Sequence, residues 1–238
     1  MRNLARDLNL FTVLARMHLH ASDYRSFLGA LWSFIGPLLT VVVLYLIFAE
    51  GIGRSVPLYP LSLLVGVVTL NFFFRTVQTI IQAVLQSRDI VLHSVAPSEV
   101  LLLSALAVPV IKFAVEMSVC AVLAACAGVF GFGQFFRFAG GLLLFVGLAG
   151  GVGLTLAVLN CLAGDVNEIW TVVSPLFFFV TPIFYTLDML SPTARSLVYW
   201  LNPLTPFILT FQQCVTGGPI PYAHGGNLWA AALQGIFF

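Results

Sequence analysis

The chain has 238 residues, of which 60% are hydrophobic and only 8% are charged, and its mean hydropathy is +1.04. A soluble domain has about 25% charged residues, so this chain lacks the polar surface that a water-soluble fold requires. Its formal net charge of +1 offers no basic face to nucleic acid. Because lipid admits only helices and closed barrels, and no ten-residue alternating strands occur, the composition indicates an all-α integral membrane protein.

The first element is an N-terminal arm, residues 1–31, that precedes every membrane-length apolar run. Its apolar residues at helical spacing are Leu4, Leu8, Phe11, Leu14 and Met17. Its arginines are Arg2, Arg6, Arg16 and Arg25. An apolar stripe beside cationic residues favours a helix lying in the membrane plane, although a soluble helix packed on a partner would show a similar stripe. Because basic residues concentrate on the inner side of membranes, the arm is expected in the cytoplasm.

Five apolar runs follow that are long enough to cross a bilayer, which takes about 20 residues in a helix. They occupy residues 32–50, 60–82, 100–128, 138–162 and 168–187. A sixth begins within residues 227–238 and is expected to continue past the last residue, so six spans are predicted in all. Alternating crossings place residues 86–99 and the turn around Asp165 in the cytoplasm, and residues 188–226 outside.

Polar side chains share one helix face in two of these runs. The second run contains Asn71, Arg75, Gln78 and Gln82, at spacings of four, three and four residues. The fifth run contains Thr171, Ser174, Phe178, Thr181 and Tyr185, at spacings of three, four, three and four residues. Polar residues inside a membrane are costly and usually functional, so both stripes are candidate walls of a channel that offers weak, exchangeable contacts. The alternative is that they join helices to one another.

The sequence contains no recognisable active site. Its single lysine, Lys112, precedes Glu116 by four residues, and the two can pair along the helix. There is no G-x-x-x-x-G-K-[ST] loop to hold ATP, and the four cysteines lack metal-ligand spacing. Asp165 and Glu168 suit a helix start, where acidic groups are favoured, better than a catalytic pair. We therefore predict no catalytic residue, metal site or cofactor in this chain.

Two short apolar stretches, residues 192–201 and 205–215, follow the fifth run and are too short to cross a membrane. Pro203 and Pro206 separate them, because proline removes a backbone donor and clashes with the preceding turn. Short helices at membrane depth are tolerated where protein surrounds them, so the pair is expected to form a re-entrant outer lid. The alternative for the aromatic pair 199–200 is a belt at the membrane surface.

Six motifs follow one another along nearly the whole chain. The first, within residues 24–48, is carried by Leu28, Gly29, Leu31, Trp32, Pro37, Leu38 and Leu39. The others are residues 64–74, the loop ending in Pro97 and Glu99, and residues 160–169, 174–185 and 202–206. Together they resemble the permease subunits of type-2 ABC exporters of O-antigen, capsular polysaccharide or teichoic acid. Gly164 departs from the family pattern, which usually has an arginine there, and residues 91–97 lack its usual lysines.

The resemblance implies a single transmembrane domain over residues 1–238, in the bacterial cytoplasmic (inner) membrane. Such a permease works as a homodimer with two separate ATP-binding cassette subunits, which hold the ATP and magnesium. Its substrate would be a lipid-linked polysaccharide, whose anionic diphosphate would meet Arg75. Residues 86–99 would form a coupling helix with an apolar centre and a polar rim, comprising Arg88, Asp89, Ile90, Val91, His93 and Glu99. The outer gate helices would carry Tyr199, Trp200, Asn202 and Pro203.

Two other functions fit parts of the sequence. An exporter of drugs or small lipids would share the fold. A membrane-embedded transferase acting on lipid-linked sugars would need an acid–base or metal cluster at the membrane face, which the sequence lacks. The sequence therefore favours a transport permease that is not itself an enzyme, contacts membrane lipids, and relies on a partner chain for ATP hydrolysis.

Overall fold

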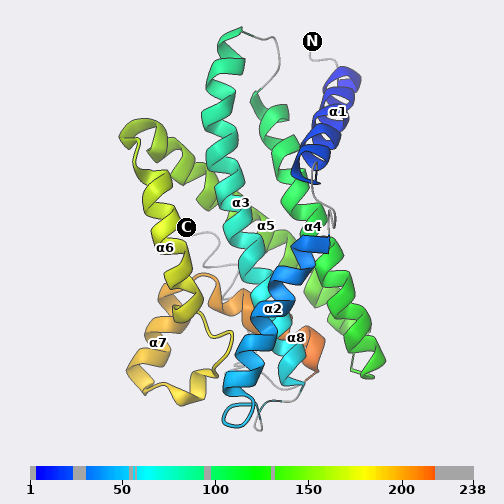
Figure 1. Cartoon of the computed structure of the whole chain (residues 1–238), viewed down its shortest axis with the longest axis vertical. Coiled ribbons are helices and arrows are strands. Elements are labelled where there is room, and N and C mark those ends of the chain that lie inside the picture. The colour runs from blue at the N-terminus through cyan, green and yellow to red at the C-terminus, as the bar shows by residue number, and fades with distance from the viewer. Residues whose placement is uncertain are drawn as a thin grey trace.

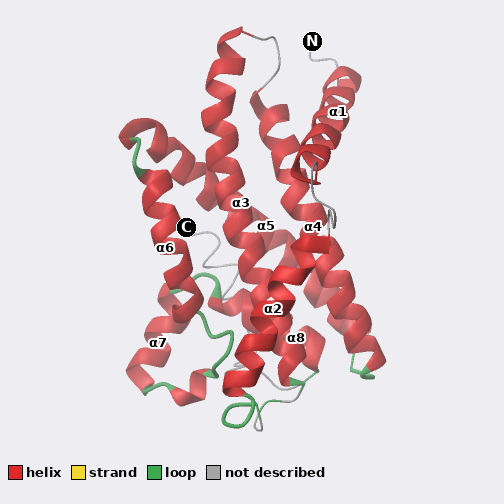
Figure 2. Ribbon diagram, viewed as in Figure 1, coloured by secondary structure: helices red, strands yellow, loops and turns green. Residues whose placement is uncertain are grey.

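The computed structural model describes residues 4–23, 31–53, 56, 58–93, 98–129 and 132–217. Within these ranges, the side chains of residues 4–7, 18–23, 31–33, 86–93, 98–99, 101 and 132 are left out. The helices are α1 (Leu4–Asp23), α2 (Leu31–Phe48), α3 (Tyr59–His93), α4 (Ser98–Cys126), α5 (Phe132–Ala163), α6 (Val166–Val180), η1 (Leu187–Met189), α7 (Pro192–Leu201) and α8 (Thr205–Thr216). All regular elements in the described ranges are helical, which confirms the predicted all-α class (Figure 2).

Three helices are long and apolar enough to cross a membrane, namely α3 over Tyr59–Leu85, α4 over Leu102–Cys126 and α5 over Gly133–Ala163. The apolar parts described for α2 and α6, Phe34–Phe48 and Val166–Val180, are shorter. The 15 residues of α6 rise about 22 Å, which is less than the hydrocarbon core of about 30 Å. The sixth predicted span lies outside the described residues.

α3 is the central helix and packs against α2, α4, α5, α6 and α8. It continues to His93, so the second predicted span, residues 60–82, lies within a longer helix whose apolar part is Tyr59–Leu85. The reason is local, since no glycine or proline interrupts the sequence between Gly66 and Pro97, and the residue before a proline disfavours helix. At 35 residues α3 rises about 52 Å, so its charged last turns extend beyond any apolar core.

The connections alternate between the two ends of the bundle (Figure 1). α1, the α5–α6 turn and the ends of α3 and α4 that flank residues 94–97 lie in one half. α7, α8 and the α2–α3 connection lie in the other half. This arrangement agrees with the predicted alternation of crossings.

α6 ends at Val180, so the predicted fifth span, residues 168–187, is wrong over its last turns. Thr181 has φ −85° and ψ 132°, an extended conformation, and its N–H makes the last helical hydrogen bond, to the carbonyl of Phe177 at 2.9 Å. Pro182 explains the stop, because it cannot donate to the preceding turn and disfavours helix at the residue before it. The chain beyond α6 is therefore not a continuation of a helical face.

The two predicted short helices after the fifth run are confirmed as α7 and α8, within one residue of their predicted limits. Ser191 caps α7 by accepting a hydrogen bond from the Ala194 N–H, and a proline opens each helix. α8 is largely buried and packs on α3 and α5, whereas α7 has no buried residue. Their role as a gate stays a prediction.

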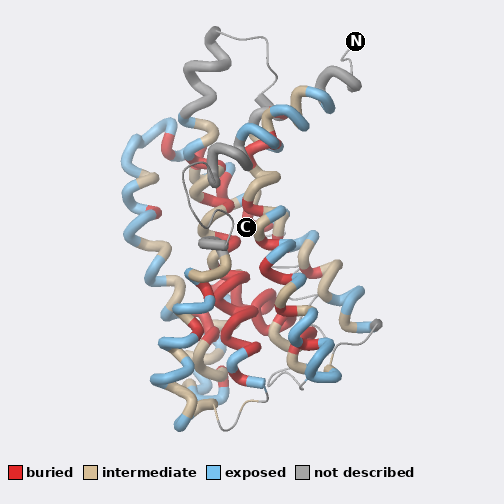
Figure 3. Tube along the Cα trace, turned by 45° about the vertical axis from the view of Figure 1, so that its right-hand side comes forward, coloured by how far each residue is buried: buried red, intermediate tan, exposed pale blue. Residues whose placement is uncertain are grey.

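The core lies around α3, with buried residues from α4, α5 and α8 packed against it, and the buried residues gather in the interior of the bundle (Figure 3). The ring of Phe145 on α5 lies 5.6 Å from that of Phe72 and 5.1 Å from that of Phe207, between centroids. A Cβ atom at Gly153 would lie 2.5 Å from the Ile80 side chain, so glycine permits this close contact of α5 with α3. The aromatic packing fixes α3 between its neighbours and leaves one of its faces less buried.

Candidate functional site

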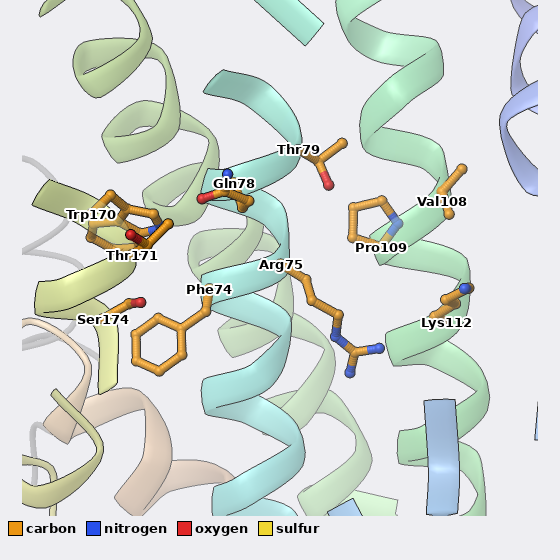
Figure 4. A pocket seen from close by; sticks show the side chains of 10 residues that line it. All are labelled: Phe74, Arg75, Gln78, Thr79, Val108, Pro109, Lys112, Trp170, Thr171 and Ser174. Atoms are coloured by element: carbon orange, nitrogen blue, oxygen red, sulfur yellow. The ribbon is translucent and has the colours of Figure 1, made fainter. Parts of the chain in front are cut away.

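A pocket of about 470 Å³ lies over α3, between α4 and α6. Its volume is within the range of small-molecule sites, about 300–1,000 Å³. Figure 4 shows side chains from these three helices around it. The lining residues are Phe74, Arg75, Gln78 and Thr79 of α3, Val108, Pro109 and Lys112 of α4, and Trp170, Thr171 and Ser174 of α6.

The predicted polar stripe of α3 is confirmed as its less buried face. Arg75 and Gln78 line the pocket, and both are partly exposed. Asn71 lies one turn before Arg75, and its carbonyl accepts a hydrogen bond from Arg75 Nε at 3.2 Å. Gln82 is exposed and lies outside the pocket lining. The stripe is therefore one face, but only its middle belongs to the pocket.

Only two of the five residues in the predicted stripe of the fifth run line the pocket. Thr171 and Ser174 line it, while Phe178 instead packs against Phe184, with ring centroids 6.1 Å apart. Thr181 is fully buried and follows the helix end, and the Tyr185 hydroxyl donates to the carbonyl of Val180 at 2.7 Å. The last two residues therefore do not extend a helical stripe, because α6 stops before Pro182.

Arg75 is held by a carboxylate from a different helix. Its Nη2 donates to both oxygens of Glu116 on α4, at 2.8 and 2.9 Å. The Glu116 side chain is only 3% exposed, whereas that of Arg75 is 33% exposed. The sequence had suggested a pair between Lys112 and Glu116 along the helix. Glu116 bonds Arg75, because packing of α3 on α4 brings the guanidinium to it, and Lys112 lines the pocket.

Gln78 is held by a polar contact with another helix, and this contact was not predicted from the sequence. Its Nε2 donates to Asn167 Oδ1 at 2.8 Å, and the Asn167 backbone N–H donates to Asn160 Oδ1 at 2.9 Å. Asn160 is buried near the end of α5, and Asn167 lies in the first turn of α6. The one feature of the sequence that pointed to this contact was the motif at residues 160–169, which contains both asparagines. This chain of contacts fixes the α5–α6 turn against α3.

An aromatic wall faces the pocket from the α6 side. Trp170 is nearly buried and meets Phe74 edge to face, with ring centroids 6.0 Å apart. It meets Phe73 in the same way at 6.1 Å. Beside this wall, the Thr171 hydroxyl donates a hydrogen bond to the carbonyl of Glu168 at 2.7 Å. The pocket thus has cations on one side and rings with hydroxyls on the other.

The predicted gate residues occupy different environments. Asn202 is buried between α7 and α8, where its Nδ2 donates to Thr181 Oγ1 at 2.8 Å and its Oδ1 accepts from the Leu204 N–H at 3.0 Å. Tyr199 packs at a small apolar cluster with Leu187, and Trp200 is exposed. Pro203 lies between the two helices. Asn202 therefore joins the helix pair to the segment after α6.

The predicted coupling segment is only partly described. Its backbone is helical to His93 as the end of α3, and α4 begins at Ser98. The side chains predicted to contact a partner lie outside the described residues: Arg88, Asp89, Ile90, Val91, His93 and Glu99. In the part of the chain that the structure describes, no group of three or more His, Cys, Asp or Glu side chains could hold a metal ion.

Comparison with known proteins gives the family. Residues 9–215 match the ABC-2 type transporter family. The O-antigen export system permease protein RfbA of Myxococcus xanthus is 27% identical over 224 residues, which cover 94% of this chain and 86% of that protein. Two proteins of the same name from Klebsiella pneumoniae are 26% and 25% identical over 226 residues, covering 93% of this chain and 86% of each relative. Because the family match spans most of its length and includes α3, α4 and α6, the chain belongs to the ABC-2 type transporter family.

Proposed function

We propose that this chain is the transmembrane subunit of an ATP-driven exporter that moves lipid-linked polysaccharide of the O-antigen, capsule or teichoic-acid type across the bacterial cytoplasmic membrane. Membership of the ABC-2 family supports a transport role. Three relatives named as O-antigen export permeases, each matching more than nine-tenths of the chain, support the polysaccharide substrate. An exporter of drugs or small lipids is the competing proposal.

The observation that carries this proposal is the pocket over α3. The polar lining residues that α3 contributes lie within an apolar helix that is mostly buried. Arginine, glutamine and hydroxyl groups there are costly in lipid unless they meet a partner or a passing substrate. Rings and hydroxyls on the α6 side suit a sugar, because rings present flat apolar surface and hydroxyls exchange hydrogen bonds. Several weak contacts allow movement where one tight site would trap the cargo.

A second copy of the chain completes the channel in this proposal. Within one copy, α3 is lined by α4 on one side of the pocket and by α6 on the other, and a second subunit would close the remaining face. Two ATP-binding cassette subunits would bind ATP and magnesium and dock at residues 86–99. The N-terminal arm would lie on the cytoplasmic face, and α7 with α8 would form the outer gate.

Filling the pocket tests the proposal. The host is a bacterial strain that makes the polysaccharide and the ATPase but lacks its own permease, and surface polysaccharide is measured by antibody labelling. Wild type should restore export, and Ser174→Trp should abolish it, because Ser174 lines the pocket. Val172→Trp is the matched control, since Val172 lies on the same helix, is 69% exposed and is outside the lining.

Two outcomes contradict the proposal. Full export by Ser174→Trp at normal membrane levels would remove the pocket from the substrate path. Polysaccharide export that does not depend on this chain at all, together with lost efflux of a drug or small lipid, would transfer the function to the competing proposal.

A further inference from the structure

α6 is capped by a side chain of α5 rather than by its own N-cap residue. Asp165 occupies the N-cap position and makes no side-chain cap hydrogen bond. The first N–H groups of a helix have no partner within that helix. One of them, the Asn167 N–H, donates to Asn160 Oδ1 at 2.9 Å, and Asn160 is buried in the last turn of α5. The start of α6 is therefore fixed to the end of α5.

The residue capped in this way also binds α3 through its side chain. Asn167 Oδ1 accepts a hydrogen bond from Gln78 Nε2 at 2.8 Å, and Gln78 lines the pocket. In the part of the chain that the structure describes, no other hydrogen bond joins α3 to α6. Asn167 thus connects α6 to two helices, with its backbone bound to α5 and its side chain bound to α3.

The side of α6 that carries Asn167 also carries its pocket residues. Trp170, Thr171 and Ser174 follow Asn167 by three, four and seven residues, so the helical period places all four on one side. The opposite side consists of apolar residues that are each more than half exposed: Ile169, Val172, Leu176 and Phe179. A rotation of α6 about its axis would therefore exchange the pocket wall for a purely apolar surface.

Apolar packing alone does not decide which side of α6 meets α3. Lipid tails are as apolar as a neighbouring helix, so burial of apolar side chains between membrane helices gives little driving force. The Thr171 hydroxyl already donates to the Glu168 carbonyl within α6, so it would lose no hydrogen bond by facing lipid. Among the described residues, the one hydrogen-bond partner of the Asn167 side chain is Gln78. Because an unpaired amide in lipid is costly, this bond favours the observed rotation of α6.

We propose that Asn167 is a positioning residue: its bonds to Asn160 and Gln78 set the rotation of α6 about its axis, so that the hydroxyls and the indole of α6 face the substrate path. Asn160 acts through Asn167, because it fixes the turn from which the Asn167 side chain projects. Without the bond to Gln78, part of the molecules would turn the apolar side of α6 toward the pocket. The consequence for transport rests on the proposed export function, whereas the rotation is measured without it.

Cysteine labelling measures the rotation directly. Membranes from cells that express the full chain with its ATPase, in a background lacking Cys126 and Cys161, are treated with a water-soluble thiol reagent. Thr171→Cys should react faster than Val172→Cys, because Thr171 lines the pocket and Val172 lies on the opposite side. Asn167→Leu keeps a side chain of similar size but removes the amide. It should lower the ratio of the two labelling rates about fivefold, as expected for loss of one hydrogen bond.

The partner residue on α3 supplies an independent variant and its control. Gln78→Leu removes the donor of the same bond, so it should lower the ratio by a similar factor. Gln82→Leu is the matched control, because Gln82 lies one turn further along α3, is exposed and is outside the lining. It should keep the ratio within about twofold of the unsubstituted value. Asn167→Asp retains an oxygen that accepts from Gln78 and should keep the ratio as well.

General destabilisation near α6 predicts a different result. Asn202→Ala removes a buried hydrogen bond to Thr181, directly after α6, but leaves the bond between Gln78 and Asn167 in place. It should lower stability without changing the labelling ratio. An equal shift of the ratio in Asn202→Ala and Asn167→Leu would overturn the positioning role, as would an unchanged ratio in Gln78→Leu. Gln78→Leu decides the question if Asn167→Leu fails to accumulate in the membrane.

Export is measured on the same variants as surface polysaccharide. Reduced export by Asn167→Leu and recovery in Asn167→Asp are expected, because only the second variant keeps the acceptor for Gln78. Normal export by Asn167→Leu together with a shifted labelling ratio would overturn the positioning role. The predicted shift of the ratio, in a chain whose unsubstituted form exports no polysaccharide, would support the rotation and contradict the proposed function alone.

Discussion

Arg75 Nη2 on α3 donates to both carboxylate oxygens of Glu116 on α4, at 2.8 and 2.9 Å, although the two residues are 41 positions apart. This ion pair joins two membrane-length helices beside a pocket lined by the same arginine. Its burial is uneven, since the carboxylate is enclosed and the guanidinium reaches the pocket. The pair thus links the stability of the helix pair to the chemistry of the site.

Removing the carboxylate should destabilise the helix pair. Glu116→Ala should lower the free energy of unfolding by about 2 kcal/mol, less than the loss of about 3–5 kcal/mol for a fully buried pair, because Arg75 is partly solvated. In a double-mutant cycle that combines Glu116→Ala with Arg75→Ala, the coupling energy between the two residues should be about 1–2 kcal/mol. Denaturant unfolding of the purified protein in detergent measures both, with Thr155→Ala as a control at an exposed residue. Strictly additive effects of the two substitutions would show that the pair contributes nothing.

Accessibility along α6 should follow the structure rather than an unbroken helical stripe. In a background lacking the exposed Cys126 and Cys161, cysteines at Thr171 and Ser174 should react with a water-soluble thiol reagent during transport, because both line the pocket. Thr181→Cys should stay unreactive, because that side chain is buried against Asn202.

Val172→Cys serves as the matched control for this labelling. Val172 is exposed in the chain but lies outside the pocket, on a face expected to meet lipid, where a water-soluble reagent does not enter. Equal labelling at Val172 and Thr171, or strong labelling at Thr181, would place the water-filled path elsewhere.

Asn202 should contribute to the stability of the α7–α8 pair. Asn202→Ala removes the bond to Thr181 Oγ1 and leaves the buried Leu204 N–H without its acceptor. The cost should be about 1–3 kcal/mol, as expected for unsatisfied buried polar groups. Thermal unfolding should show a lower midpoint than for Thr155→Ala, whose exposed hydroxyl bonds only within its own helix. Equal midpoints for the two variants would mean that the buried amide is dispensable.

The coupling segment is tested by changing its apolar centre. Ile90→Asp with Val91→Asp should leave membrane insertion unchanged and uncouple ATP hydrolysis from export, because a shallow apolar groove on the ATPase would reject two carboxylates. ATP turnover and surface polysaccharide are measured together in cells and in nanodiscs. The conservative pair Ile90→Leu with Val91→Ile should export normally. Wild-type export by the double aspartate variant would exclude this docking mode.

The sequence by itself determined the helical class, the approximate positions of the helices and the polar face of α3. These features depend on local properties: apolar length, the helical period, and prolines that break the backbone pattern. The break at Pro203 correctly separated α7 from α8. α6 likewise stops at Val180, before Pro182, although it passes through Pro175, so a proline alone does not decide where a helix ends.

Only the tertiary structure decided which residues meet across helices. The helical period of α4 places Lys112 one turn from Glu116, whereas the packing of α3 on α4 brings Arg75 into hydrogen-bonding contact with Glu116. In the same way, Gln78 bonds Asn167, and Trp170 lines the pocket. The spacing of residues along the chain predicts neither contact. A helix sequence fixes which side chains share a face, whereas the axial offset and rotation between helices, set by the whole core, fix what that face touches.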